Sequence, residues 1–394
     1  MDEVKFIPLS VPNLKGKELD YVTTAVETEW VSTAGPYVTD FEKNIARYVG
    51  VERAVSCQSG TAGLHIALML CGVERGDLVP VPTLTFIASV NPIKYIGAEP
   101  IFMDCDDSLC MDPVKLEKFL KEECFVENET LYHRASGRRI PAIVVVHIFG
   151  NMADMEAFVK LSKKYCFKIV EDACEALGTY YTEGEFAGRH AGTIGDMGVY
   201  SFNGNKIVTT GGGGMIVSND AELLEHAKHL TTQAKADEAN FIHDEIGYNY
   251  RLTNLQSALG IAQLEQLEDF IKIKEANYSH YKERLEKIPG LEILNFKEGT
   301  RSNRWFFALS VEPKLMSSTQ ELIGALREEK IQSRPIWGLI HEQAPYRDAL
   351  TYDISKANYY YKRIVNLPCS TNLSSEDVDR VCEVIEKFVE KKRK

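Results

Sequence analysis

Short apolar runs alternate with amphipathic segments between about residues 50 and 220. Four of the runs predict buried strands, because they are short, have apolar residues at their centres and are followed by turn or polar residues. These runs are 79–81, 100–104, 142–147 and 168–171. Between them, a helical spacing of apolar side chains begins after Ser59, a residue type that caps helices. Its members are Leu64, Ala67, Leu68 and Cys71. The alternation predicts an α/β fold with a mostly parallel sheet flanked by helices.

The pattern changes after Arg251, where a long and mostly helical stretch looks like a connection between two lobes. The elements predicted beyond it are a strand at 306–311, a helix at 320–328 and an amphipathic last helix from Ser375. A smaller α+β domain at the C-terminal end accounts for these elements. We therefore predict a large domain at 1–265 and a small domain at 266–394.

Charge and composition argue against several classes of partner. The 394 residues include 57 acidic and 45 basic side chains, and the net charge of -12 disfavours nonspecific binding to nucleic acid or anionic lipid. The longest apolar run, 140–150, is about half of the roughly 20 residues that a membrane-spanning helix needs. Nine cysteines, an odd number in a long chain, fit small core residues in a reducing compartment. Met1, Asp2 and Glu3 show no secretory pattern, so we expect a cytoplasmic protein.

Two carboxylates, Glu171 and Asp172, end one of the predicted buried strands. Removing a carboxylate from water costs several kcal/mol unless a cation meets it. Ligands of open α/β sheets bind at the carboxyl ends of the strands, so the cation that meets Asp172 could be the protonated ring nitrogen of a cofactor. A structural salt bridge or a helix cap would satisfy Asp172 equally well.

A lysine, Lys206, precedes four consecutive glycines at 211–214. The order differs from a Walker A loop, in which the lysine follows the glycines and opens a helix. A buried lysine can act as a nucleophilic amine that forms an imine with a carbonyl group. The alternative for Lys206 is an ordinary solvated surface side chain.

A site for a phosphate group is indicated by Ser59, Gly60 and Thr61, which offer backbone N–H groups, hydroxyls and the positive end of a helix. The same residues could be an ordinary helix cap. Phe86 follows the next strand and could stack on a planar ring or belong to the core. Phosphate site, stacking ring, acid and amine occur in the chain order expected of an enzyme that uses pyridoxal phosphate.

Ordered motifs over nearly the whole chain resemble the DegT/DnrJ/EryC1/StrS family of sugar aminotransferases, which are fold type I pyridoxal-phosphate enzymes. The motifs are 59–61, 82–88, 97–100, 146–147 with Gly150, 171–173, 201–202 with Lys206, and 247–251. The resemblance implies that Lys206 is the imine-forming lysine and catalytic base and that Asp172 pairs with the ring nitrogen. It also implies further cofactor contacts through Gly60, Thr61, Phe86, Glu175, Ser201 and Asn249. In the family, an asparagine at the Asn249 position reaches the phosphate of the neighbouring subunit, which implies a homodimer with shared active sites.

Segments 29–35, 201–214 and 243–249 look most like the aminotransferases of legionaminic acid and bacillosamine biosynthesis. The resemblance implies transfer of an amino group from glutamate, through pyridoxamine phosphate, to C4 of a nucleotide-linked 4-keto-6-deoxy-N-acetylhexosamine. The product would be a 4-amino-4,6-dideoxy sugar nucleotide for bacterial surface glycans. Candidate residues for the sugar nucleotide are Trp30, Trp337 and His341.

Two other functions are open at this point. A sugar dehydratase of the same family uses pyridoxamine phosphate and has histidine in place of the lysine, so Lys206 argues against it. A non-catalytic regulator that keeps the fold would have no need for a paired buried acid and lysine.

His226 and His229 have a spacing compatible with metal binding. Because no other ligand lies near them in the sequence, we expect a solvated helix face and no metal.

Overall fold

The large lobe is built on a mixed five-stranded sheet in the computed structural model, which describes residues 5–393. In spatial order the strands are β1 (Ala54–Cys57), β10 (Gly214–Val217), β9 (Met197–Ser201), β7 (Lys168–Asp172) and β6 (Ala142–Val146). Strands β6, β7 and β9 run parallel, whereas β10 is antiparallel to both of its neighbours. A second, parallel sheet of β2 (Leu78–Pro82), β3 (Glu99–Met103) and β17 (Leu350–Tyr352) lies beside β6.

All four strands predicted before residue 175 are confirmed, as β2, β3, β6 and β7, with ends within two residues of the prediction. They were recognisable because strands covered on both faces are apolar at every position, and β2 and β6 are buried throughout. Strands β1 and β10 were not predicted. Each has only four residues, and they make the sheet mixed.

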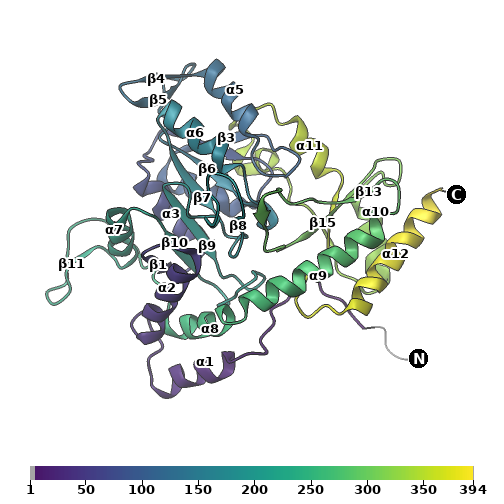
Figure 1. Ribbon diagram of the computed structural model, residues 1–394. Helices are drawn as coiled ribbons and strands as arrows, with labels where there is room; N and C mark the ends of the chain where they lie inside the picture. Colours follow the sequence, from purple (N-terminus) through teal and green to yellow (C-terminus); the bar gives the residue numbers. More distant parts are fainter. Residues whose placement is uncertain (1–4, 394) are drawn as a thin grey trace.

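Helix α3 (Gly60–Leu70) packs against β7, β9 and β10 and is buried on nearly all sides. Its predicted cap is confirmed, since Ser59 Oγ accepts a hydrogen bond from the Ala62 N–H at 3.1 Å. The other helices of this lobe are α1 (Glu18–Glu27), α2 (Pro36–Val49), α4 (Asn91–Ile96), α5 (Pro113–Glu123), α6 (Met155–Tyr165) and α7 (Ala221–Thr231). Two small hairpins, β4 (Cys124–Glu127) with β5 (Thr130–His133) and β11 (Lys235–Asp237) with β12 (Ile242–His243), extend from the lobe (Figure 1).

The predicted connecting helix is interrupted and forms α8 (Asn254–Leu264) and α9 (Leu267–Leu285). The break has a local cause, because the Gln266 side chain donates to the Ala262 carbonyl and so satisfies an acceptor at the end of α8. Figure 1 shows α9 continuing from α8 into the small lobe.

The small lobe contains an antiparallel sheet of β13 (Leu291–Ile293), β15 (Phe307–Val311), β18 (Ile364–Leu367) and β16 (Arg334–Pro335). It also contains α10 (Thr319–Glu328), α11 (Ser355–Tyr361) and α12 (Ser375–Arg393), and the strand pair β8 (Tyr180–Tyr181) with β14 (Thr300–Arg301) joins the lobes. Several segments among residues 5–393 cross the predicted boundary. Helix α11 donates the Lys356 and Ala357 N–H groups to Asp104 of the large lobe. Strand β17 pairs with β3 of the large lobe, and Ile7 forms a bridge with Ile331. The division at 265 stays a prediction.

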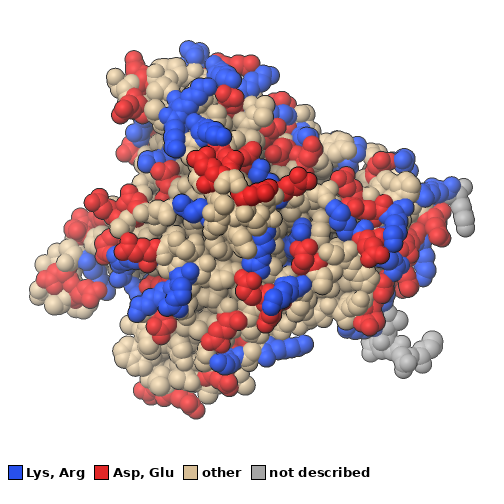
Figure 2. Space-filling view, viewed as in Figure 1, with Lys and Arg blue, Asp and Glu red and all other residues tan. Residues whose placement is uncertain are grey.

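Acidic and basic side chains are interspersed over the face shown in Figure 2. Within residues 5–393, no helix has the length and apolar character needed to cross a bilayer.

All nine cysteines are free thiols, and seven of them are buried as expected, whereas Cys166 is exposed and Cys174 is half-buried. Met1, Asp2 and Glu3, on which the expectation about secretion rests, lie outside the described residues.

Candidate active site

A cavity of about 280 Å³ lies where the carboxyl ends of β7 and β9 meet the N-terminus of α3. Parallel strands deliver their last residues to one edge of a sheet, which is where ligands of such folds bind. The cavity is lined by seven of the residues expected to bind the cofactor, namely Gly60, Thr61, Phe86, Asp172, Glu175, Ser201 and Lys206. The fold therefore brings together side chains that lie far apart in the sequence.

Lys206 lies in the loop between β9 and β10, and its ammonium group points at two neighbours. Its Nζ atom is 3.6 Å from Glu175 Oε1 and 4.0 Å from the centre of the Trp305 ring. The Trp305 indole N–H in turn donates to the Asn205 carbonyl at 2.9 Å. The side chain of Lys206 is 11% exposed, so the alternative of a solvated surface lysine is wrong. The amine is held against an aromatic face at the cavity.

Asp172 ends β7 inside the cavity and is 5% exposed. Its carboxylate accepts hydrogen bonds from the Ser89 hydroxyl at 2.6 Å and from the Cys174 N–H at 3.1 Å. Among residues 5–393, no lysine, arginine or histidine forms an ion pair with it, so the alternative of a structural salt bridge is not observed. A positively charged group that enters the cavity would complete its surroundings.

Glu171 precedes Asp172 but points to the other face of β7, as successive strand residues do. It is completely buried and accepts hydrogen bonds from His147 Nε2 at 2.8 Å and from the backbone N–H groups of Gly192 and Ile194 at 2.8 and 2.7 Å. Burial alone would raise the pKa of Glu171, but the His147 contact and the backbone donors outweigh it and lower the pKa. The two adjacent carboxylates thus have different surroundings, and only Asp172 faces the cavity.

Glu175 is buried beside Lys206. Its Oε2 atom accepts a hydrogen bond from the Phe149 N–H at 2.8 Å. Burial raises the pKa of Glu175 to about 7, against the opposing effect of the positive charge on Lys206. The side chain can therefore take up or release a proton near neutral pH.

The part of the cavity at the N-terminus of α3 suits an anion. Gly60 and Thr61 open α3, where the first backbone N–H groups have no partner within the helix and the helix dipole is positive. A Cβ atom on Gly60 would lie 2.6 Å from Cys174 Sγ and 3.0 Å from Ser201 Cβ, so glycine is needed for this close packing. Phe86 is 49% exposed at the rim and is not a core residue. Together with Lys206 and Asp172, these groups fit an aromatic ring that carries a phosphate and an aldehyde.

Comparison with known proteins decides the family. The model of the DegT/DnrJ/EryC1/StrS aminotransferase family matches residues 12–386. The chain belongs to this family. It is accordingly a pyridoxal-phosphate-dependent aminotransferase with the fold type I architecture of that family, and its relatives support a nucleotide sugar as substrate.

The similarity extends over the full length of several relatives. GDP-perosamine synthase of Escherichia coli O157:H7 is 36% identical over 385 residues, which cover 98% of this chain and 99% of the relative. UDP-4-amino-4,6-dideoxy-N-acetyl-beta-L-altrosamine transaminase of Campylobacter jejuni is 30% identical over 391 residues, covering 98% and 99%. The crystal structure of a DegT DnrJ EryC1 StrS aminotransferase from Brucella abortus superposes with a TM-score of 0.84 at 27% identity, covering 94% of this chain and 95% of that one.

Of the residues expected to bind the sugar in this aminotransferase, only Trp337 lines the cavity, where its ring lies 6.1 Å from that of Phe86. His341 lies outside the lining and its Nδ1 atom is 2.7 Å from the Thr83 hydroxyl. Trp30 is 54% exposed and also outside. Asn249, expected to contact the phosphate of a neighbouring subunit, is exposed and forms a bridge with Thr232, away from the cavity lining of its own chain.

Several residues that line the aminotransferase cavity were not predicted. Ser89 directly follows the motif at 82–88, so the signal was present in the sequence. A motif longer by one residue would have included Ser89. Trp305 had no such signal, because its contact with Lys206 arises only from the packing of the small lobe against the large one. Asn203 and Asn205 lie within the predicted lysine segment.

His226 and His229 lie on a partly solvated face of α7, but the premise that no other potential ligand lies near them is wrong. Their Nε2 atoms lie 2.8 Å from Glu245 Oε1 and 2.7 Å from Asp244 Oδ1, respectively. These contacts could not be predicted from the sequence, because Asp244 and Glu245 are separated from α7 along the chain. The chain reaches Asp244 only after the β11–β12 hairpin has turned back toward the helix.

Proposed function

We propose that this aminotransferase moves an amino group from glutamate to C4 of a nucleotide-linked 4-keto-6-deoxy-N-acetylhexosamine. The product would be a 4-amino-4,6-dideoxy sugar nucleotide for a bacterial surface glycan, as in legionaminic acid or bacillosamine biosynthesis. The observation that carries the chemistry is one cavity with the Lys206 amine and the Asp172 carboxylate in its lining. The names of the relatives support the sugar class, since one denotes a UDP-linked 4-amino-4,6-dideoxy N-acetyl sugar and another a GDP-linked sugar.

Each cavity residue has a distinct part in this proposal. When bound, pyridoxal phosphate supplies an aldehyde and an electron-withdrawing ring. Lys206 provides the amine for the aldehyde and carries protons to and from the reacting carbon. Asp172 keeps a positive charge on the ring nitrogen. Gly60, Thr61 and Ser201 hold the phosphate.

The residues around the lysine position it and cover the ring. Trp305 and Glu175 orient the Lys206 amine through the contacts at 4.0 and 3.6 Å. Phe86 would cover the cofactor ring at the rim and, with Trp337, would limit the access of water. We assign Trp337 to the sugar because it lines the cavity beside Phe86. Trp30 and His341 would contact the nucleotide sugar only beyond this cavity.

An assay panel tests the substrate. Purified enzyme is incubated with glutamate and 4-ketosugar nucleotides that differ in the nucleotide, UDP or GDP, and in the presence of the 2-acetamido group. We expect 2-oxoglutarate and a 4-amino sugar to form in equal amounts from an N-acetylated substrate. Preference for a substrate without the acetamido group would contradict the proposed sugar. Loss of a hydroxyl group without amination would identify a dehydratase.

We further propose a cytoplasmic homodimer in which Asn249 of each subunit completes the site of the other. The exposed segment before Asn249 carries Phe241, Ile242 and Ile246, which are 75%, 54% and 83% exposed and would be covered by a second copy. Free thiols at all nine cysteines support the location.

Mixing two inactive variants, Lys206→Ala and Asn249→Ala, tests the shared site. Each mixed dimer would contain one site with both native residues, so we expect activity to return after subunit exchange. A mixture that forms mixed dimers and stays inactive would rule out sharing. The purified variants alone, treated identically, provide the baseline.

A further inference from the structure

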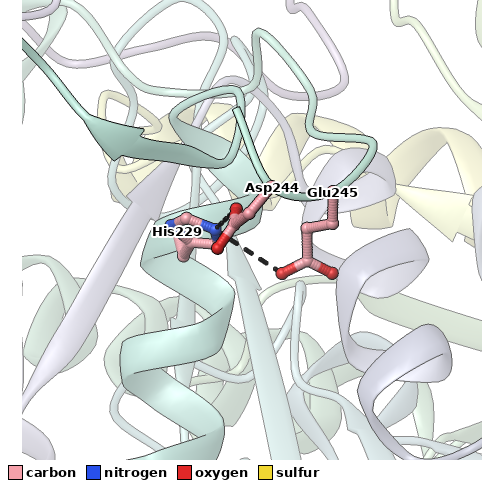
Figure 3. A group of neighbouring side chains, drawn as sticks. All are labelled: His229, Asp244 and Glu245. Carbon is pink, nitrogen blue, oxygen red and sulfur yellow. Dashed lines mark hydrogen bonds and ion pairs between the residues drawn. The ribbon is translucent and has the colours of Figure 1, made fainter. Parts of the chain in front are cut away.

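Three potential metal ligands, His229 on α7 and Asp244 and Glu245 after β12, lie together in Figure 3, and a further histidine, His226, lies one turn earlier on α7. His226 and His229 lie one turn apart on α7, and Asp244 and Glu245 are consecutive residues directly after the hairpin. Ligand atoms of His229, Asp244 and Glu245 all lie within 4.8 Å of one another. His226 lies outside this group of three, and its Nε2 atom is 2.8 Å from Glu245 Oε1. None of the four lines the active-site cavity.

Each histidine Nε2 atom has one carboxylate oxygen at hydrogen-bond distance, and His229 Nε2 has a second carboxylate oxygen nearby. His229 Nε2 faces two carboxylate oxygens, of Asp244 at 2.7 Å and of Glu245 at 3.6 Å. An imidazole nitrogen carries at most one hydrogen, so it cannot donate well to both. Glu245 Oε1 is likewise approached by the Nε2 atoms of both histidines. Nitrogen and oxygen ligands around a tetrahedral zinc ion, at about 2.0–2.2 Å from the metal, lie about 3.4 Å apart. The observed separations lie on either side of this value.

We propose that His226, His229, Asp244 and Glu245 form a binding site for a divalent transition-metal ion of the zinc class. Two imidazoles and two carboxylates make up a ligand set that zinc accepts, whereas magnesium and calcium prefer oxygen ligands throughout. A divalent ion would also neutralise the two adjacent carboxylates. Small side-chain rotations that open the direct hydrogen bonds would admit the ion.

The ion would have a structural effect, because it would join α7 to the segment after β12. Backbone hydrogen bonds already link these two elements at one end. Beyond Glu245 the chain is held to the end of α7 by backbone hydrogen bonds, from the Tyr248 N–H to the Leu230 carbonyl at 2.7 Å and from the Tyr250 N–H to the Thr231 carbonyl at 3.1 Å. The hairpin before it is mostly exposed. Metal binding at Asp244 and Glu245 would therefore attach the end of the hairpin to α7. The contact between α7 and the segment after β12 would then be longer by one turn of the helix.

Zinc binding by the untagged holoenzyme tests the site. The protein is dialysed against chelator, titrated with zinc chloride, passed through a desalting column and analysed for metal. We expect one retained zinc per chain, and slower hydrogen exchange at 235–247 when zinc is present. His229→Gln and Asp244→Asn should each weaken zinc binding at least about tenfold. Magnesium chloride at the same concentration should produce neither effect.

His280→Gln is the matched control. It removes a histidine that makes a similar contact, 2.9 Å from Asp379, with the same 25% exposure of the side chain as His229, but that lies in no group of potential metal ligands among the described residues. This variant should bind zinc as the unaltered enzyme does. The proposal is overturned if no zinc is retained, if His229→Gln and Asp244→Asn bind it undiminished, or if His280→Gln loses as much.

Discussion

Lys206→Ala is expected to lose amino transfer by about 10³-fold or more in kcat/KM. The reason is that Lys206 is the only lysine in the cavity lining among residues 5–393, and its amine is already directed by Trp305 and Glu175. The fold should persist, because Glu175, the buried carboxylate beside the Lys206 amine, has a pKa raised by burial to about 7 and can take up a proton when the lysine is removed. Steady-state kinetics with glutamate, together with the thermal unfolding midpoint, measure both effects.

The Lys206→Arg variant distinguishes the contribution of a positive charge at position 206 from that of a nucleophilic amine. Arginine keeps the positive charge near Glu175 and Trp305 but does not lose its proton to act as a nucleophile. We expect this variant to be as inactive as the alanine variant. Lys164→Ala removes an exposed lysine paired with Glu117 and should leave kcat/KM unchanged. Substantial turnover by the arginine variant would mean that position 206 contributes only charge.

Asp172→Asn is expected to lower turnover by about 10²–10³-fold while the protein folds nearly normally. Asparagine is similar in size, and its side-chain oxygen can still accept a hydrogen bond from Ser89 or from the Cys174 N–H. The variant loses the negative charge that would stabilise a protonated ring nitrogen. Kinetics and thermal unfolding of the same preparations distinguish the two effects, and full turnover would refute the role of Asp172.

The neighbouring carboxylate offers a matched comparison with the opposite outcome. Glu171→Gln removes a buried charge that His147 and the Gly192 and Ile194 N–H groups satisfy, so we expect a loss of about 3–5 kcal/mol in the free energy of unfolding. Equal stability of the two variants would mean that the surroundings of the two carboxylates differ less than the hydrogen bonds indicate.

The buried strands and capped helices were predictable because their signals are local. The run at 142–147 is apolar from Ala142 to Val146, as a strand covered on both faces must be, and the run at 168–171 has Ile169 and Val170 at its centre. Ser59 marks the start of α3 by the chemistry of a helix cap. The break between α8 and α9 was missed, since the Gln266 side chain ends α8 through a contact that apolar spacing does not encode.

The sequence by itself determined which chemical groups this enzyme has and in what order, including the amine at 206 and the acid at 172. Only the tertiary structure decided which groups satisfy the buried Glu171 and that Ser89 and Trp305 support the acid and the amine. The same holds for His226 and His229, whose carboxylate neighbours come from beyond a hairpin. The physical reason is that residue type and local spacing are properties of one chain segment, whereas burial and pairing depend on which distant segments pack against it.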